Sequence, residues 1–254
     1  MLSKKKDIWI VISLCVLAFY IIFMIYPLGI LFKNAVIENN GSFTFAYFSK
    51  FLSKNYYFST IFNSFKVSLA ATALTLIIGT PLAYFYNMYK IKGKTFLQII
   101  IILCSMSAPF IGAYSWILLL GRNGLITNTL KNLTGFNVPS IYGFGGILLV
   151  LCMQLYPLVF LYVSGALRNI DNSLLEASEN MGCTGARRFF KIIIPLCIPT
   201  ILAAALMVFM RAFADFGTPL FIGEGYRTFP VEIYNQFMNE TGSDKNFASA
   251  VSII

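Results

Sequence analysis

The chain has 254 residues, of which 58% are hydrophobic and only 11% are charged. Soluble domains are about a quarter charged and slightly under half apolar, and the mean hydropathy here is +0.76. These values exclude a water-soluble globule and a disordered chain, and they predict an integral membrane protein. The net charge of +9 would suggest nucleic acid in a soluble protein. Here we attribute it to topology and expect no nucleic-acid partner, because basic residues in short cytoplasmic loops orient membrane proteins.

Residue types that usually carry catalysis or bind nucleotides are scarce in this chain. It has no histidine, and its five cysteines are widely spaced without a C-x-x-C pair. We interpret the cysteines as buried thiols rather than as metal ligands or disulfide partners. The phosphate-binding pattern G-x-x-x-x-G-K-[ST] does not occur. We therefore expect no enzymatic chemistry and no resident cofactor.

Apolar runs divide the chain, and a helix that crosses a bilayer needs about 20 such residues. Five complete runs and a nine-residue start of a sixth are present: 8–32, 67–89, 95–121, 142–167, 192–210 (resuming to 223) and 246–254. We predict an all-α, polytopic transmembrane helix bundle with five complete spans plus the start of a sixth, in the front part of a longer polypeptide. The first run is longer than a signal-peptide core and lacks an A-x-A-like site, which favours a retained helix over a cleaved signal.

The distribution of basic residues predicts the orientation of these spans. With the amino terminus inside, the inner segments 1–7, 90–94 and 168–191 hold ten basic residues in 36 positions, against eight in the 80 positions of the outer segments. This asymmetry predicts a multi-pass protein of the cell (inner) membrane with a cytoplasmic amino terminus.

An aromatic-rich stretch follows the first run. Residues 41–58 predict a short helix at the membrane interface, where aromatic rings are favoured, or alternatively a receptor-docking surface. We accordingly expect the first transmembrane helix and an outer aromatic segment over 1–57. The rest of the transmembrane domain would span 58–254.

The long loop 168–195 predicts two short helices joined by a turn. Ser173 and Glu176 have the S-x-x-E spacing of a capping box, and Gly182 suits a left-handed C-cap. An apolar stripe at i, i+3, i+7 spacing comprises Leu174, Ala177 and Met181. The second helix would enter the membrane at Pro195, and its basic residues are Arg187, Arg188 and Lys191. This shape suits a rigid projection presented to a cytoplasmic partner.

The same loop resembles the EAA signature of permease subunits of binding-protein-dependent ABC importers. That signature reads E-A-A, three residues, G, nine residues, I-x-L-P, and Ser178 and Ile194 depart from it here without a change of spacing. The resemblance implies the type I ABC importer permease fold. It also implies an ATPase-coupling role for Glu176, Ala177, Ser178, Gly182, Ile192 and Pro195.

Partners follow from the same resemblance. The loop would be the coupling helix, seated on a dimer of cytoplasmic ABC ATPase subunits, and an extracytoplasmic solute-binding protein would deliver the cargo. A second permease half or subunit and the membrane lipid would complete the assembly. The alternatives are that Glu176 serves only as a helix cap and that Arg187 and Arg188 are ordinary positive-inside bases.

The fifth run carries two ionisable residues, Arg211 and Asp215, four positions apart, where helical side chains can pair. Charged groups in a span usually face the bundle interior or water, so they would form either a neutralising pair or part of the substrate path. Gly217 and Pro219 then predict a break in the helix. Our candidate residues for the translocation path or gate are Arg211, Asp215, Gly217 and Pro219.

The stretch from Asp215 to Asn235 resembles the ferric-iron branch of the permease family, and similar stretches occur in phosphonate and polyamine permeases. The resemblance implies import of ferric iron by alternating access, with a phosphonate, polyamine or other small solute as the alternative cargo. Asp215, Glu224 and Tyr226 could offer oxygen ligands, although we expect the binding protein to hold the metal. A non-transporting membrane scaffold or sensor is the alternative of another class, and a channel is disfavoured because no pore-loop signature is present.

Overall fold

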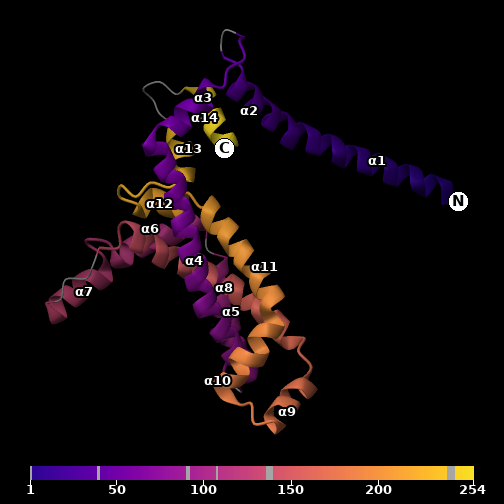
Figure 1. Cartoon of the computed structure of the whole chain (residues 1–254), viewed down its shortest axis with the longest axis vertical. Coiled ribbons are helices and arrows are strands. Elements are labelled where there is room, and N and C mark those ends of the chain that lie inside the picture. The colour runs from indigo at the N-terminus through magenta and orange to yellow at the C-terminus, as the bar shows by residue number, and fades with distance from the viewer. Residues whose placement is uncertain (1, 39–40, 90–91, 107, 136–139, 239–243) are drawn as a thin grey trace. The chain divides into compact units, whose positions relative to one another are not determined.

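The computed structural model describes all residues except 1, 39–40, 90–91, 107, 136–139 and 239–243, and its regular elements are helices (Figure 1). Two compact units are present: Met1–Ser59 with Glu232–Ile254, and Thr60–Val231. Within the described residues, four helices are long and apolar enough to cross a membrane, or five if one bent pair forms a single span. The four are Ile8–Val36, Asn55–Met88, Phe144–Arg168 and Gly185–Ala214. The predicted all-α, polytopic architecture is confirmed.

The first unit contains the amino-terminal rod and the short helices around it. α1 (Leu2–Tyr20) and α2 (Tyr26–Val36) join through a π-helical turn, and the large apolar side chains along this rod are exposed, as a lipid-facing helix requires. α14 (Lys245–Ile253) packs against α2 and against α3 (Ala46–Ser53). α3 confirms the short helix that the aromatic-rich stretch predicts.

Aromatic packing and one buried carboxylate hold the first unit together. The ring of Tyr57 lies 5.3 Å from the ring of Phe51 and 5.3 Å from that of Phe247. Glu232 is only 2% exposed, and its carboxylate accepts hydrogen bonds from the Tyr56 hydroxyl at 3.0 Å and from Gln236 Nε2 at 2.7 Å. These bonds offset part of the cost of burying the charge.

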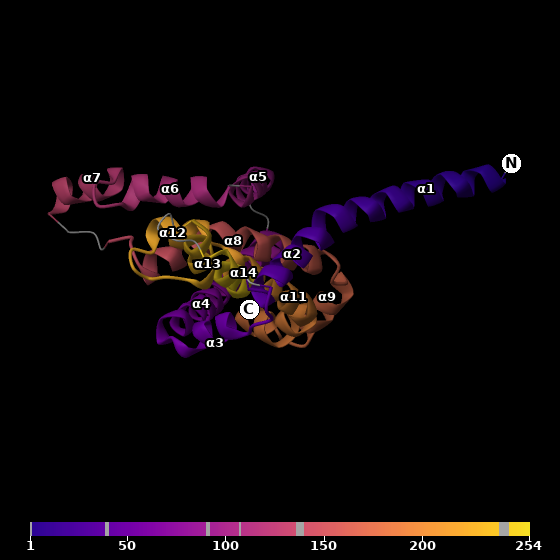
Figure 2. The same ribbon diagram turned by 90° about the horizontal axis from the view of Figure 1, so that it is seen from above.

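The second unit is organised around α8 (Phe144–Arg168). The helices packed against it include α5 (Lys94–Ser105), α6 (Pro109–Leu120), α11 (Ile194–Ala214) and α12 (Gly217–Ile222). In the view of Figure 2, α5, α6 and α7 (Leu125–Thr134) form a row along one side of this unit. α9 (Asn172–Asn180) and α10 (Gly185–Arg188) also belong to this unit, as does α4 (Asn55–Met88) from Thr60 onward, whereas α13 (Phe229–Met238) belongs to the first unit from Glu232 onward.

Close packing of α4 on α8 depends on a glycine. A Cβ atom added at Gly79 would lie 2.8 Å from the Cβ of Val159, a separation that packed side chains do not tolerate. Val159 itself is fully buried, beside Phe160 and Val163 of the same core. α4 corresponds to the second predicted span, although the helix begins at Asn55 rather than near position 67.

The third predicted span is bent. The run 95–121 is divided into α5 and α6, and the helices over Lys94–Ser105 and Phe110–Leu133 meet at 105°, so they form a fifth span only if the bent pair crosses as one. α6 begins at Pro109, whose ring cannot continue a preceding helix. The prediction of buried thiols is confirmed for Cys152 and Cys197. It is wrong for Cys15 and Cys104, which are exposed on apolar helices, and Cys183 is half-buried. Apolar surroundings in sequence do not distinguish a protein core from a lipid-facing surface.

Candidate functional site

The loop between α8 and α11 forms a compact helical hairpin, which we call the α9 hairpin (residues 171–195). α9 ends in a Schellman motif: the Gly182 N–H donates to Glu179 O at 2.9 Å and the Cys183 N–H to Ser178 O at 2.9 Å. Gly182 has φ +73°, and no atom of this chain lies within 4 Å of the position its Cβ would take. The predicted left-handed C-cap at Gly182 is confirmed.

The amino-terminal cap of α9 differs from the predicted one. Asp171 is the N-cap, and its Oδ1 accepts a hydrogen bond from the Ser173 N–H at 3.0 Å. The helix thus starts two residues before the start that a Ser173 cap would set, so Glu176 lies beyond the N3 position and the capping box is not formed. Glu176 is exposed, and within the described residues its carboxylate makes no hydrogen bond or ion pair.

The hairpin is anchored on its inner face and open on its outer face. Leu175 and Phe189 pack against the core of the second unit, and the Phe189 ring lies 4.8 Å from that of Tyr84. Arg188 forms an ion pair with Glu179 across the turn. The predicted apolar stripe faces outward: Leu174 is 52% and Met181 is 79% exposed, and Ala177 is exposed beside them.

The remaining residues of the predicted coupling set lie on both faces of the hairpin. Ser178 is 2% exposed, and its hydroxyl donates to Leu175 O at 2.7 Å. Serine at this position is therefore buried without an unsatisfied hydroxyl. Ile192 is half-buried in a π-helical turn that carries the second helix into α11, and Pro195 is exposed in the first turn of α11. The predicted second helix, which enters the span at Pro195, is confirmed.

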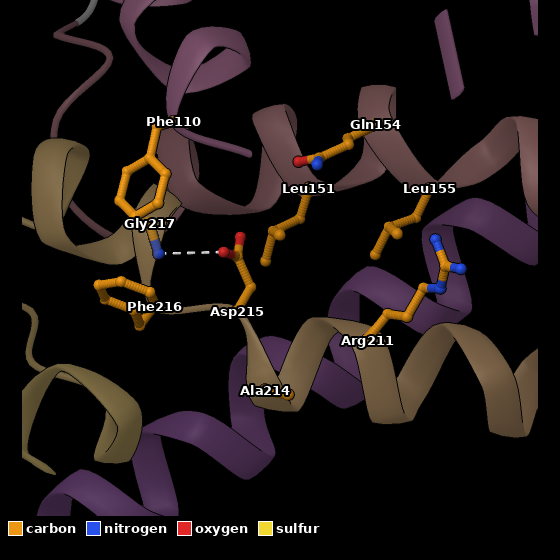
Figure 3. Close-up of a pocket in the computed structure, with 9 residues that line it drawn as sticks. All are labelled: Phe110, Leu151, Gln154, Leu155, Arg211, Ala214, Asp215, Phe216 and Gly217. Atoms are coloured by element: carbon orange, nitrogen blue, oxygen red, sulfur yellow. Dashed lines mark hydrogen bonds between the residues drawn. The ribbon is translucent and has the colours of Figure 1, made fainter. Parts of the chain in front are cut away.

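A cavity of about 340 Å³ lies in the second unit where α6, α8 and α11 meet the 215–217 segment (Figure 3). Figure 1 shows this region, near α6 and α12, at the other end of the unit from α9. Its nine lining residues are Phe110, Leu151, Gln154, Leu155, Arg211, Ala214, Asp215, Phe216 and Gly217. Three of the four path residues that the sequence predicts, Arg211, Asp215 and Gly217, are therefore brought together.

Of the two alternatives for Arg211 and Asp215, the neutralising pair is not formed among the described residues. α11 ends at Ala214 and the backbone of Asp215 is extended, so the i, i+4 geometry of a helix no longer applies. Asp215 Oδ1 instead accepts a hydrogen bond from the Gly217 N–H at 3.0 Å, at the start of α12. In Figure 3 the side chains of Leu151 and Leu155 stand between the two charged groups.

Gln154 is the residue of this region that the sequence reasoning missed. It lines the 340 Å³ cavity and also a second cavity of about 210 Å³, which Cys104, Ser115 and Trp116 line from the other side. Within the described residues, its Oε1 atom is buried and has no hydrogen-bond partner. The signal was present in the sequence, because Gln154 is the single amide side chain of the apolar run 142–167.

The other predicted residues lie outside the cavity lining. Pro219 is buried, and its carbonyl oxygen accepts from the Gly223 N–H at 2.9 Å. Glu224 pairs with Arg122, and the ring of Tyr226 lies 5.4 Å from that of Phe144. The three candidate oxygen donors, Asp215, Glu224 and Tyr226, therefore face different partners. Within the described residues no group of three or more acidic or cysteine side chains could hold a metal.

Residues 75–254, which include both the hairpin and the cavity, match the family described as binding-protein-dependent transport system inner membrane component. The chain belongs to this family. It is therefore a permease, a membrane-spanning component of such a transport system, as the EAA resemblance implied. The same match supports the multi-pass, inner-membrane location that the spans predict.

Relatives of the permease carry different cargo names. It is 28% identical over its whole length to the ferric transport system permease protein FbpB of Actinobacillus pleuropneumoniae. It is 25% identical over its whole length to a Salmonella typhimurium protein named for 2-aminoethylphosphonate transport, PhnU. The chain covers 36% of the FbpB sequence and 88% of the PhnU sequence. It therefore spans little more than a third of the ferric relative.

A solved structure confirms the predicted fold. The permease superposes on a chain of the crystal structure of a bacterial alginate ABC transporter in complex with an alginate pentasaccharide-bound periplasmic protein, with a TM-score of 0.80. The match covers 98% of this chain and 89% of the other at 18% sequence identity. At this identity the likeness supports the ABC importer permease fold alone.

Proposed function

We propose that the permease works in an ATP-driven importer by alternating access, with the α9 hairpin as its contact to a dimer of separate ABC ATPase subunits. The observation that carries this proposal is the outer face of the hairpin. Leu174 and Met181 are exposed on one side of α9, and the carboxylate of Glu176, also exposed, has no partner among the described residues. Exposed apolar side chains and an unpaired charge on the same short helix are typical of a surface that a partner covers.

The geometry of the hairpin also suits the transmission of force. Its second helix continues without interruption into α11, so Gly185–Ala214 is one rod that runs from the hairpin to the cavity. A push on α9 would reach Arg211 and Asp215 through this rod. Coupling of this kind is reciprocal, so cargo delivery at the other end would alter ATP hydrolysis by the partner.

The positive-inside pattern supports a cytoplasmic location for the hairpin and the amino terminus. The hairpin carries Arg187, Arg188 and Lys191 close to the end of the span, and such residues accumulate on the cytoplasmic side. The cavity would then lie toward the opposite side, where an extracytoplasmic binding protein delivers cargo. A second permease half or subunit would complete the path.

Ferric iron is the cargo we propose, and the cavity supplies one supporting feature. The Asp215 carboxylate and the Gln154 amide oxygen are the kind of oxygen donor that hard cations prefer. We infer transient contact during passage rather than a resident metal site. One observation favours a second cargo class: the Arg211 guanidinium lines the same cavity, and guanidinium groups recognise phosphate and phosphonate oxygens.

Two charge-removing variants would distinguish these cargoes. In vesicles that contain the full transporter and its binding protein, uptake of radiolabelled ferric iron and of 2-aminoethylphosphonate would be compared for Asp215→Asn and Arg211→Gln. If ferric iron is the cargo, the vesicles should take up iron and not 2-aminoethylphosphonate. Asp215→Asn should slow iron uptake more than Arg211→Gln does. Uptake of the phosphonate with the opposite order would contradict the iron assignment and leave the importer assignment intact.

A scaffold or sensor would behave differently from an importer. The importer proposal predicts that an ATP-hydrolysing subunit co-purifies with the permease and that Glu176→Arg removes it. The matched control on the same helix is Glu179→Arg, which breaks a contact within the hairpin. If no ATP-hydrolysing subunit co-purifies with the wild-type chain, the importer proposal is contradicted.

A further inference from the structure

A polar cavity of about 500 Å³ lies at the hairpin end of the second unit, separate from the two cavities around Gln154. Its lining combines two cations, Lys94 and Arg168, with one amide, Asn87. Apolar side chains complete it: Met88, Leu167, Ile170 and Leu175. The residues come from the ends of α4 and α8, the start of α5, and the α9 hairpin with the turn before it.

Specific contacts build the walls of this cavity. Asn87 Nδ2 donates to Ser164 Oγ at 2.8 Å and thereby joins α4 to α8. The Tyr86 hydroxyl donates to Gln98 Oε1 at 2.7 Å and joins α4 to α5. Lys94 Nζ lies 4.5 Å from the centroid of the Tyr86 ring, which holds the ammonium group at the cavity edge. The arrangement is therefore fixed by packing and does not depend on a chance approach of surface side chains.

The charge of the cavity is uncompensated. None of its lining residues is acidic, and within the described residues neither Lys94 nor Arg168 forms an ion pair with a carboxylate. α5 begins at Lys94 without a side-chain cap, so the partial positive charge of its first turn adds to that of the two side chains. The cavity thus attracts an anion.

The position of the cavity indicates where that anion comes from. α4 ends at Met88 and α8 ends at Arg168, so the cavity lies where two spans leave the apolar layer. Cations beside Met88, Leu167 and Ile170 match the boundary between a lipid headgroup and its acyl chains. Basic pockets between helices at this level suit the phosphate of anionic lipids.

We propose that this cavity binds the phosphate headgroup of an anionic phospholipid, held by Lys94 of α5 and Arg168 of α8. The headgroup bridges two helices that no side-chain ion pair connects among the described residues. Because Ile170 and Leu175 line the same cavity, the bound lipid also supports the base of the α9 hairpin. This site is independent of the cargo and of the ATPase assignment.

The test uses the purified full chain with its co-purifying subunits in detergent and counts bound lipids by native mass spectrometry. Phosphatidylglycerol and phosphatidylcholine are added separately at equal concentration. We expect preferential retention of phosphatidylglycerol, and Lys94→Gln with Arg168→Gln should weaken it by about fivefold for each charge removed. The matched control, Arg187→Gln with Lys191→Gln, removes two exposed bases at the same end of the unit and should retain the lipid.

Four results would overturn the site. Equal retention by the double variant, or equal loss in the control, would show that no specific pair of bases is used. Displacement of phosphatidylglycerol by millimolar inorganic phosphate would assign the cavity to a soluble anion. Loss of the ATP-hydrolysing subunit from the double variant with lipid retention unchanged would assign the two bases to a protein contact.

A charge-preserving variant guards against loss of folding as the cause. Lys94→Arg with Arg168→Lys keeps both cations. This variant should retain phosphatidylglycerol to within about twofold of wild type, since the affinity for a headgroup depends mainly on charge. Loss of retention in this folded variant would contradict the headgroup assignment.

Discussion

The α9 hairpin and the Arg211–Gly217 cavity differ in where their unpaired hydrogen-bond acceptors lie. In the hairpin, Asp171, Ser178 and Arg188 bond within the chain, and the acceptor without a partner among the described residues, the Glu176 carboxylate, is on the surface; a buried donor, Arg188 Nε, also has none. In the cavity, Gln154 Oε1 and Asp215 Oδ2 are buried and have no partner among the described residues. A rigid element with an open outer face suits a permanent partner, whereas buried unmet hydrogen-bonding capacity suits a ligand that comes and goes.

The largest expected effect comes from the hairpin turn. Gly182→Val places a β-branched residue at φ +73°, at a cost of about 1–2 kcal/mol or more, and should lower the initial rate of cargo uptake at least tenfold (about 1.4 kcal/mol). Gly182→Asn tolerates this φ and should keep most of the uptake. Because no atom of this chain is near the new side chain, loss of uptake in both variants would indicate contact with a partner, and full activity of the valine variant would contradict the rigid-hairpin account.

Asp215 sharpens the comparison because it has both a structural and an electrostatic role. Asp215→Ala removes the acceptor of the Gly217 N–H and should lower the free energy of unfolding by about 1 kcal/mol. Asp215→Asn keeps an acceptor, so it should fold with near-normal stability while ferric uptake falls by roughly fivefold, about the effect of one lost charge-assisted contact. Thermal unfolding in detergent and vesicle uptake measure the two quantities. An asparagine variant with normal uptake would show that the carboxylate charge does not touch the cargo.

Gln154 tests the opposite expectation, loss of function without loss of stability. Gln154→Leu replaces an unsatisfied buried acceptor by an apolar group of similar size, and such a change is neutral or stabilising by up to about 1 kcal/mol. Uptake should fall by roughly threefold because one polar contact to the cargo is lost. If the variant instead unfolds at a lower temperature, Gln154 is a structural residue and the two cavities carry no path through it.

The smallest effect is expected at the ion pair inside the hairpin. Glu179 is 53% exposed on its side chain and Arg188 is 16% exposed, and pairs at the surface contribute about 0–1 kcal/mol. Glu179→Gln should therefore change uptake by less than about twofold, while Glu176→Gln, on the outer face, should change it more. The same vesicle assay ranks the two variants, and a reversed order would place the partner contact on the other side of α9.

Sequence reasoning succeeded where a local rule decides the structure. A glycine after an amphipathic helix predicts a left-handed cap, and Gly182 adopts it. Apolar length predicts spans, and four long helices match it within the described residues. The predicted helix break also follows locally, since α11 ends at Ala214 and α12 begins at Gly217, although Pro219 lies within α12.

It failed where neighbouring residues compete or where tertiary packing decides. Asp171 and Ser173 can both cap a helix, and spacing alone chose the wrong one. Arg211 and Asp215 have the spacing of a pair, but the chain leaves the helix between them. Gln154 is one polar residue in an apolar run, and only the fold shows that two cavities meet at it.

The account depends most directly on the outer face of α9. A photo-reactive amino acid at position 176, in native membranes that hold the whole transporter, should cross-link to an ATP-hydrolysing subunit. The same group at position 131, an exposed position of α7, should not. Capture at 176 alone is the result that the account predicts. Equal capture at both positions, or none at 176 with an assembled and active transporter, would contradict it.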